Sequence, residues 1–223
     1  MSKAAKKIGV ILAGCGVYDG AEIHEAVLTL LAIDRAGAAA VIFAPDIPQA
    51  HVVNHLTGQE MAESRNVLTE AARIARGKIA DLATFDPAEV DALILPGGFG
   101  AAKNLCDFAF KGPDCTVNPD VEKAIRAARD AGKPIGALCI APAILAKLFG
   151  GEGAKLTIGS DEGTAAALEK LGAVHCPTTH GEIIVDEGLK LVTSPCYMLD
   201  ASVSQIADGA ANTVAALLKL MEA

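Results

Sequence analysis

An α/β fold with a doubly wound, mostly parallel sheet and helices on both faces is the architecture that this sequence predicts. Short apolar runs alternate with longer amphipathic ones along the chain. Apolar residues make up 52% of the 223 residues, whereas aromatic residues make up only 4% and tryptophan is absent. Small aliphatic residues of this kind build strands that are buried on both faces. Several apolar runs also end in glycine- or proline-containing turns, which is typical of strand ends.

The first half of the chain has the pattern of a strand, a helix and a second strand. In order, we expect a strand over Ile8–Leu12, a glycine-rich loop over Ala13–Gly20, a helix over Glu22–Arg35 and a strand over Ala40–Phe43. Residues 49–82 hold a polar loop and one helix candidate, Ala62–Arg76. We interpret this segment as an insertion between core strands rather than a separate domain.

The second half continues the alternation to the end of the chain. We expect strands over Ala92–Leu95, Pro134–Leu138, Leu156–Ile158, Glu182–Val185 and Leu189–Thr193, and helices over Pro119–Ala131, Pro142–Phe149, Thr164–Leu171 and Ala201–Met221. No repeat or low-complexity linker divides the chain, so residues 1–223 are expected to form a single domain. In a sheet of this type the functional site is expected at the carboxyl ends of the strands.

The net charge and the pattern of the first residues exclude several classes of function and location. Lys and Arg number 19 and Asp and Glu number 27, which gives a net charge of −8 with no basic stripe. This balance argues against nucleic acid and anionic membrane surfaces as partners. No window approaches the roughly 18 apolar residues of a membrane span. The first residues carry neither the free apolar segment nor the cleavage site of a signal peptide, so we expect a cytoplasmic protein.

The six cysteines have no zinc-type spacing and no C-x-x-C pair. Free thiols and no metal site are therefore expected. One of them, Cys139, stands out because it ends an apolar strand and is followed by Pro142, which suits the first turn of a helix. A turn with no loop presents its side chain sharply, as in hydrolases with a nucleophile elbow. The adjacent helix N-terminus is expected to lower the thiol pKa and favour the reactive thiolate. The alternative is a buried cysteine that only packs.

Two further segments fall at the same sheet edge. Leu95-Pro-Gly-Gly98 closes a strand, and its glycines can point N–H groups at an oxyanion, although a plain tight turn is the alternative. Glu22 and Glu25 lie on one face of the first helix, close to the end of the first strand. Such acids often only stabilise a helix start. A carboxyl group beside the thiol could instead stay protonated through burial and move protons in catalysis.

Taken together, these segments resemble the PfpI superfamily, which includes class I glutamine-amidotransferase-like proteins and the parkinsonism-associated deglycase. Leu95-Pro-Gly-Gly98 with the following Gly100–Leu105 is similar to its oxyanion loop, and Leu138-Cys-Ile-Ala-Pro142 to its cysteine elbow. The stretches Gly16–Glu25, Asn54–Gly58 and Cys115–Asn118 resemble the ElbB-like (enhancing lycopene biosynthesis) branch, whose members are described as glyoxalases. The likeness covers essentially the whole chain and implies a flavodoxin-like fold.

The resemblance implies roles for individual residues. Cys139 becomes the nucleophile, Glu25 the catalytic acid and base, Glu22 a possible second acid, and the N–H groups of Gly98 and Ile140 the oxyanion donors. The implied reaction converts glyoxal to glycolate, or methylglyoxal to lactate, through a hemithioacetal on Cys139. It needs no metal, nucleotide or glutathione. Members are commonly dimeric, so the resemblance also implies a homodimer.

The sequence departs from other parts of the superfamily. Ile140 follows the cysteine where protease-like members have histidine, which disfavours peptidase activity. Thr193–Tyr197 lacks the His-x-Glu pair of amidotransferases. His180-Gly-Glu182 matches the His-x-Glu sequence. However, a further predicted strand follows it, whereas the amidotransferase pair comes just before the final helix, so its location is wrong for that pair. His55 is either a surface residue or a substrate-lining one. Cys15, Cys106 and Cys196 also fall near strand ends, where packing is the favoured role.

Three functions therefore remain open. The leading hypothesis is a glyoxalase-type enzyme that acts on small 2-oxoaldehydes. A redox-sensing or regulatory protein linked to isoprenoid metabolism would use the same accessible thiol, with oxidation instead of turnover. An amidotransferase-like subunit that handles ammonia for a partner enzyme is the third, although the missing histidine disfavours autonomous glutaminase activity.

Overall fold

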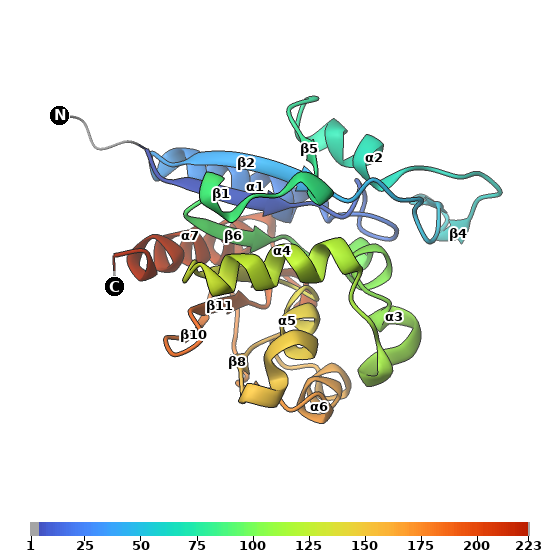
Figure 1. Cartoon of the computed structure of the whole chain (residues 1–223). Helices are drawn as coiled ribbons and strands as arrows, with labels where there is room; N and C mark the ends of the chain where they lie inside the picture. Colours follow the sequence, from blue (N-terminus) through green and yellow to red (C-terminus); the bar gives the residue numbers. More distant parts are fainter. Residues whose placement is uncertain (1–4, 223) are drawn as a thin grey trace.

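A seven-stranded sheet in the order β10-β11-β7-β6-β1-β2-β5 forms the centre of the computed structural model, which describes residues 5–222 (Figure 1). All neighbouring strands are parallel except the pair β10 and β11. The strands are β1 (Lys7–Ile11), β2 (Ala39–Ala44), β5 (Ala80–Asp81), β6 (Ala92–Leu95), β7 (Ile135–Leu138), β10 (Ile184–Asp186) and β11 (Leu191–Ser194). The predicted mostly parallel α/β fold is confirmed.

Helices cover both faces of this sheet, with α1 and α7 on one face and α4 and α5 on the other (Figure 1). The helices are α1 (Ile23–Arg35), α2 (Val67–Ile74), α3 (Phe108–Lys111), α4 (Pro119–Asp130), α5 (Pro142–Phe149), α6 (Glu162–Lys170) and α7 (Val203–Leu220). Strands β1, β6 and β7 are almost wholly buried, which explains their unbroken apolar sequences.

Local capping sets several boundaries that apolar periodicity misplaced. Helix α2 begins at Val67 and not at Ala62, because the Asn66 side chain accepts a hydrogen bond from the Thr69 N–H at 2.9 Å. Helix α6 begins earlier than predicted, because Asp161 caps it through the N–H of Thr164 at 2.7 Å. Short polar side chains thus decided where these helices start.

Residues 49–82, interpreted as an insertion, contain more regular structure than expected. They hold the hairpin of β3 (Val53–Asn54) and β4 (Gln59–Glu60), then α2, and finally β5, which pairs with β2 at the edge of the central sheet. The predicted strand near Leu156–Ile158 is β8 (Lys155–Leu156), which pairs with β9 (Val174–His175) outside the central sheet. The single-domain organisation stays a prediction.

Close packing of α7 on the sheet depends on a glycine in β7. A side chain at Gly136 would place its Cβ 3.1 Å from Leu217 Cδ1 and 3.2 Å from Thr213 Cγ2, both on α7. The helix therefore approaches the sheet through a position without a side chain. Within residues 5–222, no helix is both long and apolar enough to cross a membrane.

Two buried threonines on the α1–α7 layer provide a test of this packing. Thr29 is fully buried and its Oγ1 has no hydrogen-bond partner among the described residues, whereas Thr213 donates to the Gly209 carbonyl at 2.8 Å. Because an unpaired buried hydroxyl is costly, we expect Thr29→Val to raise the free energy of unfolding by about 1 kcal/mol. The matched Thr213→Val is expected to lower it. Urea denaturation measures both, and a loss of stability in Thr29→Val would contradict the packing described.

Candidate functional site

Cys139 lies at the turn between β7 and α5 in a strained backbone conformation. Its φ is +59°, in the left-handed region that residues with a side chain rarely adopt. The Cys139 N–H donates to the Ser194 carbonyl on β11 at 2.9 Å, and Ala141 N–H closes the turn onto the Leu138 carbonyl at 3.0 Å. The side chain is only 6% exposed. The structure therefore gives Cys139 the sharp presentation that the sequence predicts.

Glu25 on α1 is fully buried and faces the same point. Its Oε2 accepts a hydrogen bond from the Gly97 N–H at 2.9 Å, and its Oε1 accepts one from the Tyr197 N–H at 3.1 Å. The carboxyl group also lies beside the Cys139 thiol, close enough that each group shifts the pKa of the other. Three segments distant in sequence thus meet at one carboxyl group.

Gly97 is the position through which the thiol and the carboxyl group come together. A Cβ at Gly97 would lie 2.8 Å from Glu25 Oε2 and 2.9 Å from Cys139 Sγ, and would also collide with the Cys139 Cβ. Any side chain here would push the two groups apart. The sequence prediction selected Gly98 for its N–H and missed that the preceding glycine permits the contact itself.

Burial dominates the ionisation of Glu25. Desolvation, with a smaller contribution from the negative charge of Glu22, raises the pKa of the Glu25 carboxyl from 4.5 to about 7, against the opposing hydrogen bonds from Tyr197 and Gly97. The expectation of a carboxyl group that can hold a proton near neutral pH agrees with this value. Such a group can give and take protons at physiological pH.

The expected lowering of the Cys139 pKa is wrong. Burial raises the pKa of the thiol well above its ordinary value, and the neighbouring Glu25 charge raises it further. The Gly98 N–H opposes both effects without overcoming them. The expectation considered only the helix N-terminus, whose effect on the thiol pKa is smaller than the effects of desolvation and of a buried carboxylate. In the resting site the proton therefore stays on sulfur.

Glu22 supports the site from the start of α1. It is 8% exposed, its Oε2 accepts from the Glu25 N–H at 2.7 Å, and its own N–H donates to the Gly97 carbonyl at 2.9 Å. The side chain thus caps the helix and ties it to the Gly97 turn. These contacts place Glu22 beside Glu25, and its role as a second acid stays a prediction.

The two predicted oxyanion donors have N–H groups without a backbone partner. Within residues 5–222, neither the Gly98 N–H nor the Ile140 N–H donates to a backbone carbonyl. Gly98 has φ of +92°, and a Cβ there would lie 2.9 Å from the Ala21 carbonyl carbon. The loop therefore requires glycine at this position, and the Gly98 N–H lies close enough to the Cys139 thiol to lower its pKa.

The other histidines and cysteines considered in the sequence lie in different environments. His55 braces the loop after β1, where its Nε2 accepts from the Tyr18 N–H at 3.2 Å and its Nδ1 contacts the Val53 carbonyl at 3.0 Å. His180 is exposed and bonds the Asp200 carbonyl at 2.9 Å. Cys106 is buried, and its thiol donates a hydrogen bond to the Ala101 carbonyl at 3.3 Å.

Two residues of the site, Tyr197 and Cys196, were missed or undervalued in the sequence. Tyr197 supplies an N–H to Glu25, and its hydroxyl bonds His24 Nδ1 at 2.8 Å. Cys196, with φ of +42°, belongs to the same cluster of buried residues as Cys139. The only sequence signal was that Thr193–Tyr197 follows a predicted strand, as Cys139 does.

The raised Glu25 pKa predicts a pH-dependent stability. The pKa of Glu25 is about 7 in the folded chain and 4.5 in the unfolded chain, so the folded chain binds the proton more tightly. This difference stabilises the folded chain fully below pH 4.5, and the stabilisation is lost as the pH rises through 7. We expect the free energy of unfolding to fall by about 3 kcal/mol over that range. Glu25→Gln, which cannot ionise, should remove this dependence even if it is less stable overall. Equal pH slopes for the two proteins would contradict the burial described.

Known proteins resemble this chain over nearly its full length. The human protein named "Glutamine amidotransferase-like class 1 domain-containing protein 3, mitochondrial" is 48% identical, over 98% of this chain and 84% of its own length. The rat "ES1 protein homolog, mitochondrial" is 47% identical, over 96% and 84%. The crystal structure of an isoprenoid biosynthesis protein with an amidotransferase-like domain from Ehrlichia chaffeensis matches with a TM-score of 0.88 at 35% identity, over 96% of this chain and 99% of that one.

The names of the human and rat relatives contradict the predicted cellular location. The human and rat relatives are both named mitochondrial proteins, so the prediction of a cytoplasmic protein is wrong by this comparison. That prediction rested on the missing pattern of a secretory signal, and such a pattern carries no information about mitochondria.

The DJ-1/PfpI family matches residues 15–197, a range that contains Glu25, the Gly97 turn and the Cys139 elbow. Because this family matches most of the chain, and because a relative is 48% identical over 98% of the chain, the chain belongs to the DJ-1/PfpI family.

Proposed function

We propose that this protein is a cofactor-independent glyoxalase-type enzyme that converts glyoxal to glycolate, or methylglyoxal to lactate. The observation that carries the proposal is the proximity of a buried carboxyl group, Glu25, to a thiol on a strained turn, Cys139. The thiol is almost closed off from solvent, which favours small substrates. Both the acid–base group and the nucleophile that the reaction needs are therefore present in one place.

The first step uses the proton that the pair shares. As Cys139 Sγ bonds the aldehyde carbon, its proton passes to the Glu25 carboxylate and the carbonyl oxygen becomes an oxyanion. The N–H groups of Gly98 and Ile140, which donate to no backbone carbonyl among the described residues, are suited to stabilise that oxygen. Glu25 then gives this proton to the oxyanion, which forms a hemithioacetal and leaves Glu25 as a carboxylate. A thiol with a raised pKa is activated in this way only when a base is in contact with it.

The second stage is an internal oxidation and reduction. A proton leaves the former aldehyde carbon to Glu25 and is returned to the neighbouring carbonyl carbon through an enediol, which leaves a thioester on Cys139. Water then cleaves the thioester and releases the 2-hydroxy acid. The aldehyde carbon is oxidised and its neighbour reduced, so the balance needs only water. Because Glu25 accepts a proton at the outset, turnover should rise as the pH passes through about 7.

Substitution of the pair tests this function. Cys139→Ala should abolish the formation of glycolate and lactate, and Glu25→Gln should reduce it by about 10²-fold or more, because a positioned acid–base group contributes at least that much. Cys176→Ala, a half-exposed thiol outside the site, is the matched control. Chromatographic detection of the two acids measures the rates, and glutamine hydrolysis is assayed in parallel for the amidotransferase-like alternative. Equal product formation by wild type and Cys139→Ala would exclude the proposal.

We also infer membership of the ElbB-like branch from the sequence segments that resemble it, above all Gly16–Glu25. The isoprenoid biosynthesis name of the Ehrlichia chaffeensis relative is in keeping with that branch. This supports an association with isoprenoid metabolism without identifying the reaction.

A second candidate function is redox sensing, and the location of Cys196 favours it. Its thiol lies in one buried cluster with Cys139, close enough to influence the Cys139 pKa. Peroxide would oxidise the Cys139 thiol to a sulfenic acid with release of water. Attack by the Cys196 thiol would then form a disulfide and release a second water.

Mass spectrometry after mild peroxide treatment distinguishes this candidate. We expect a peptide pair linked through Cys139 and Cys196 that dithiothreitol reverses, and a stable sulfenic or sulfinic acid on Cys139 in the Cys196→Ser variant. Modification of Cys176 or Cys15 before Cys139 would exclude selective sensing at this site.

A further inference from the structure

Two neighbouring residues of α1 hold the backbone and the side chain of Tyr197. The Tyr197 N–H donates to Glu25 Oε1 at 3.1 Å, and the Tyr197 hydroxyl lies 2.8 Å from His24 Nδ1. His24 and Glu25 are consecutive in the first turn of the helix. The proposed function uses Glu25 but gives no role to His24 or to the side chain of Tyr197.

The contact between Tyr197 and His24 is built to last at neutral pH. Burial raises the pKa of the Tyr197 phenol, and the neighbouring Glu22 and Glu25 charges raise it further, so the hydroxyl keeps its proton. It donates to His24 Nδ1 when the imidazole carries its own proton on Nε2. The two rings also pack together, with centroids 5.9 Å apart. His24 is exposed, so the contact closes the outer side of the Tyr197 turn.

The turn that carries Tyr197 has little regular structure to hold it. It is a single 3₁₀ turn over Cys196–Met198, closed by short-range hydrogen bonds from Met198 to Pro195 and from Leu199 to Cys196. Cys196 has φ of +42°, a strained conformation that persists only where the surroundings enforce it. The contacts with α1 supply such a restraint from a segment 173 residues away.

The position of the Tyr197 N–H matters because Glu25 is fully buried. Only two N–H groups within residues 5–222 donate to its carboxyl oxygens, those of Gly97 and Tyr197. Burial raises the pKa of Glu25, and the Tyr197 N–H opposes this rise more strongly than the Gly97 N–H does. A small displacement of the turn would therefore change how readily Glu25 ionises.

The other titratable groups around Glu25 do not replace this donor. Glu22 faces it from the same helix, Cys139 from the turn after β7, and Cys196 from the turn after β11. Each of these groups is neutral or negatively charged. No cation within residues 5–222 acts on the carboxyl group, so the stabilisation of its charged form depends on the backbone donors.

We propose that His24 and Tyr197 are positioning residues of the site, whose side chains hold the Tyr197 turn against α1 so that its N–H stays on the Glu25 carboxyl group. The kinetic consequence of this inference rests on the proposed glyoxalase function. Its consequence for the ionisation of Glu25 is independent of any reaction.

NMR of the full chain labelled with ¹³C at the glutamate carboxyl groups measures that ionisation directly. The Glu25 signal is assigned by its loss in Glu25→Gln. Tyr197→Phe, which keeps the ring, and His24→Leu should each raise the midpoint of the Glu25 titration by about half a pH unit or more, because the carboxylate loses part of a hydrogen bond.

His24→Gln separates the hydrogen bond from the charge of the histidine. Its amide oxygen can accept from the Tyr197 hydroxyl, but the side chain has no positive charge at any pH. We therefore expect His24→Gln to bring the midpoint back toward that of the wild type. In the turnover of glyoxal, Tyr197→Phe and His24→Leu should move the rising limb of kcat to higher pH by the same amount, with little change in KM.

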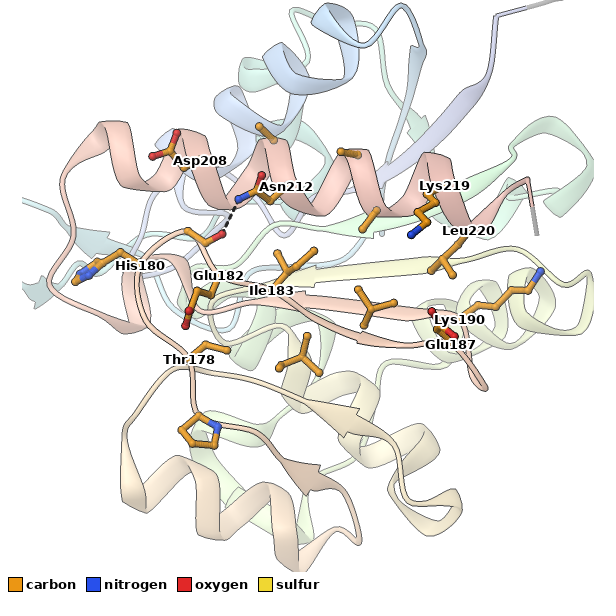
Figure 2. A pocket seen from close by; sticks show the side chains of 17 residues that line it. Thr178, His180, Glu182, Ile183, Glu187, Lys190, Asp208, Asn212, Lys219 and Leu220 are labelled. Carbon is orange, nitrogen blue, oxygen red and sulfur yellow. Dashed lines mark hydrogen bonds between the residues drawn. The ribbon is translucent and has the colours of Figure 1, made fainter.

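Two matched controls remove the same chemical groups elsewhere. Tyr18→Phe changes the other of the two tyrosines in the chain. His180→Leu changes an exposed histidine that bonds the Asp200 carbonyl and lines the groove between α7 and β10 (Figure 2). Both variants should keep the wild-type midpoint, since neither residue contacts Glu25 or Tyr197.

The midpoints decide the outcome. A raised midpoint in Tyr197→Phe and His24→Leu, with recovery in His24→Gln and none of it in the controls, supports the proposal. An unchanged midpoint in Tyr197→Phe, or a His24→Gln variant that behaves like His24→Leu, would overturn it. If the wild type forms no glycolate, the proposed function fails, and the NMR titration still decides whether these residues position the Glu25 donor.

Discussion

The contact of the buried Glu25 carboxyl group with the Cys139 thiol is the interaction on which the site depends. Burial of a carboxylate away from water is costly, and here two backbone N–H groups replace part of the lost hydrogen bonding to solvent. The compensation is incomplete, which is why the pKa rises to about 7. This incomplete compensation lowers the stability of the folded chain, but it also gives Glu25 a proton affinity that is useful at neutral pH.

The fold supplies the groups of this contact from separate segments. Helix α1 carries Glu25, the turn after β6 provides the Gly97 N–H, and the turn after β11 provides the Tyr197 N–H. Parallel strands bring these turns to one edge of the sheet, because their carboxyl ends all point the same way. Gly97 lets the segments approach, and the strained φ of Cys139 aims the thiol at their meeting point. Strain of this kind persists only where the surrounding structure enforces it.

Helix α1 connects the site with the surface of the molecule. It holds Glu25 on its buried side, exposes Val27 and Leu31, and packs beside α7.

The sequence by itself determined the parallel α/β fold and the sharp turn at Cys139, because these follow from apolar runs and turn residues that are local in the chain. The choice of Glu25 as the partner of Cys139 came from the resemblance to the PfpI superfamily. Only the tertiary structure decided the ionisation of the pair, since burial and a neighbouring charge outweigh the helix N-terminus. It also brought in Tyr197 and Cys196, which are far from Cys139 in the sequence. Local patterns specify elements and single residues. Distances between segments, and the desolvation that sets a pKa, exist only after the chain has packed.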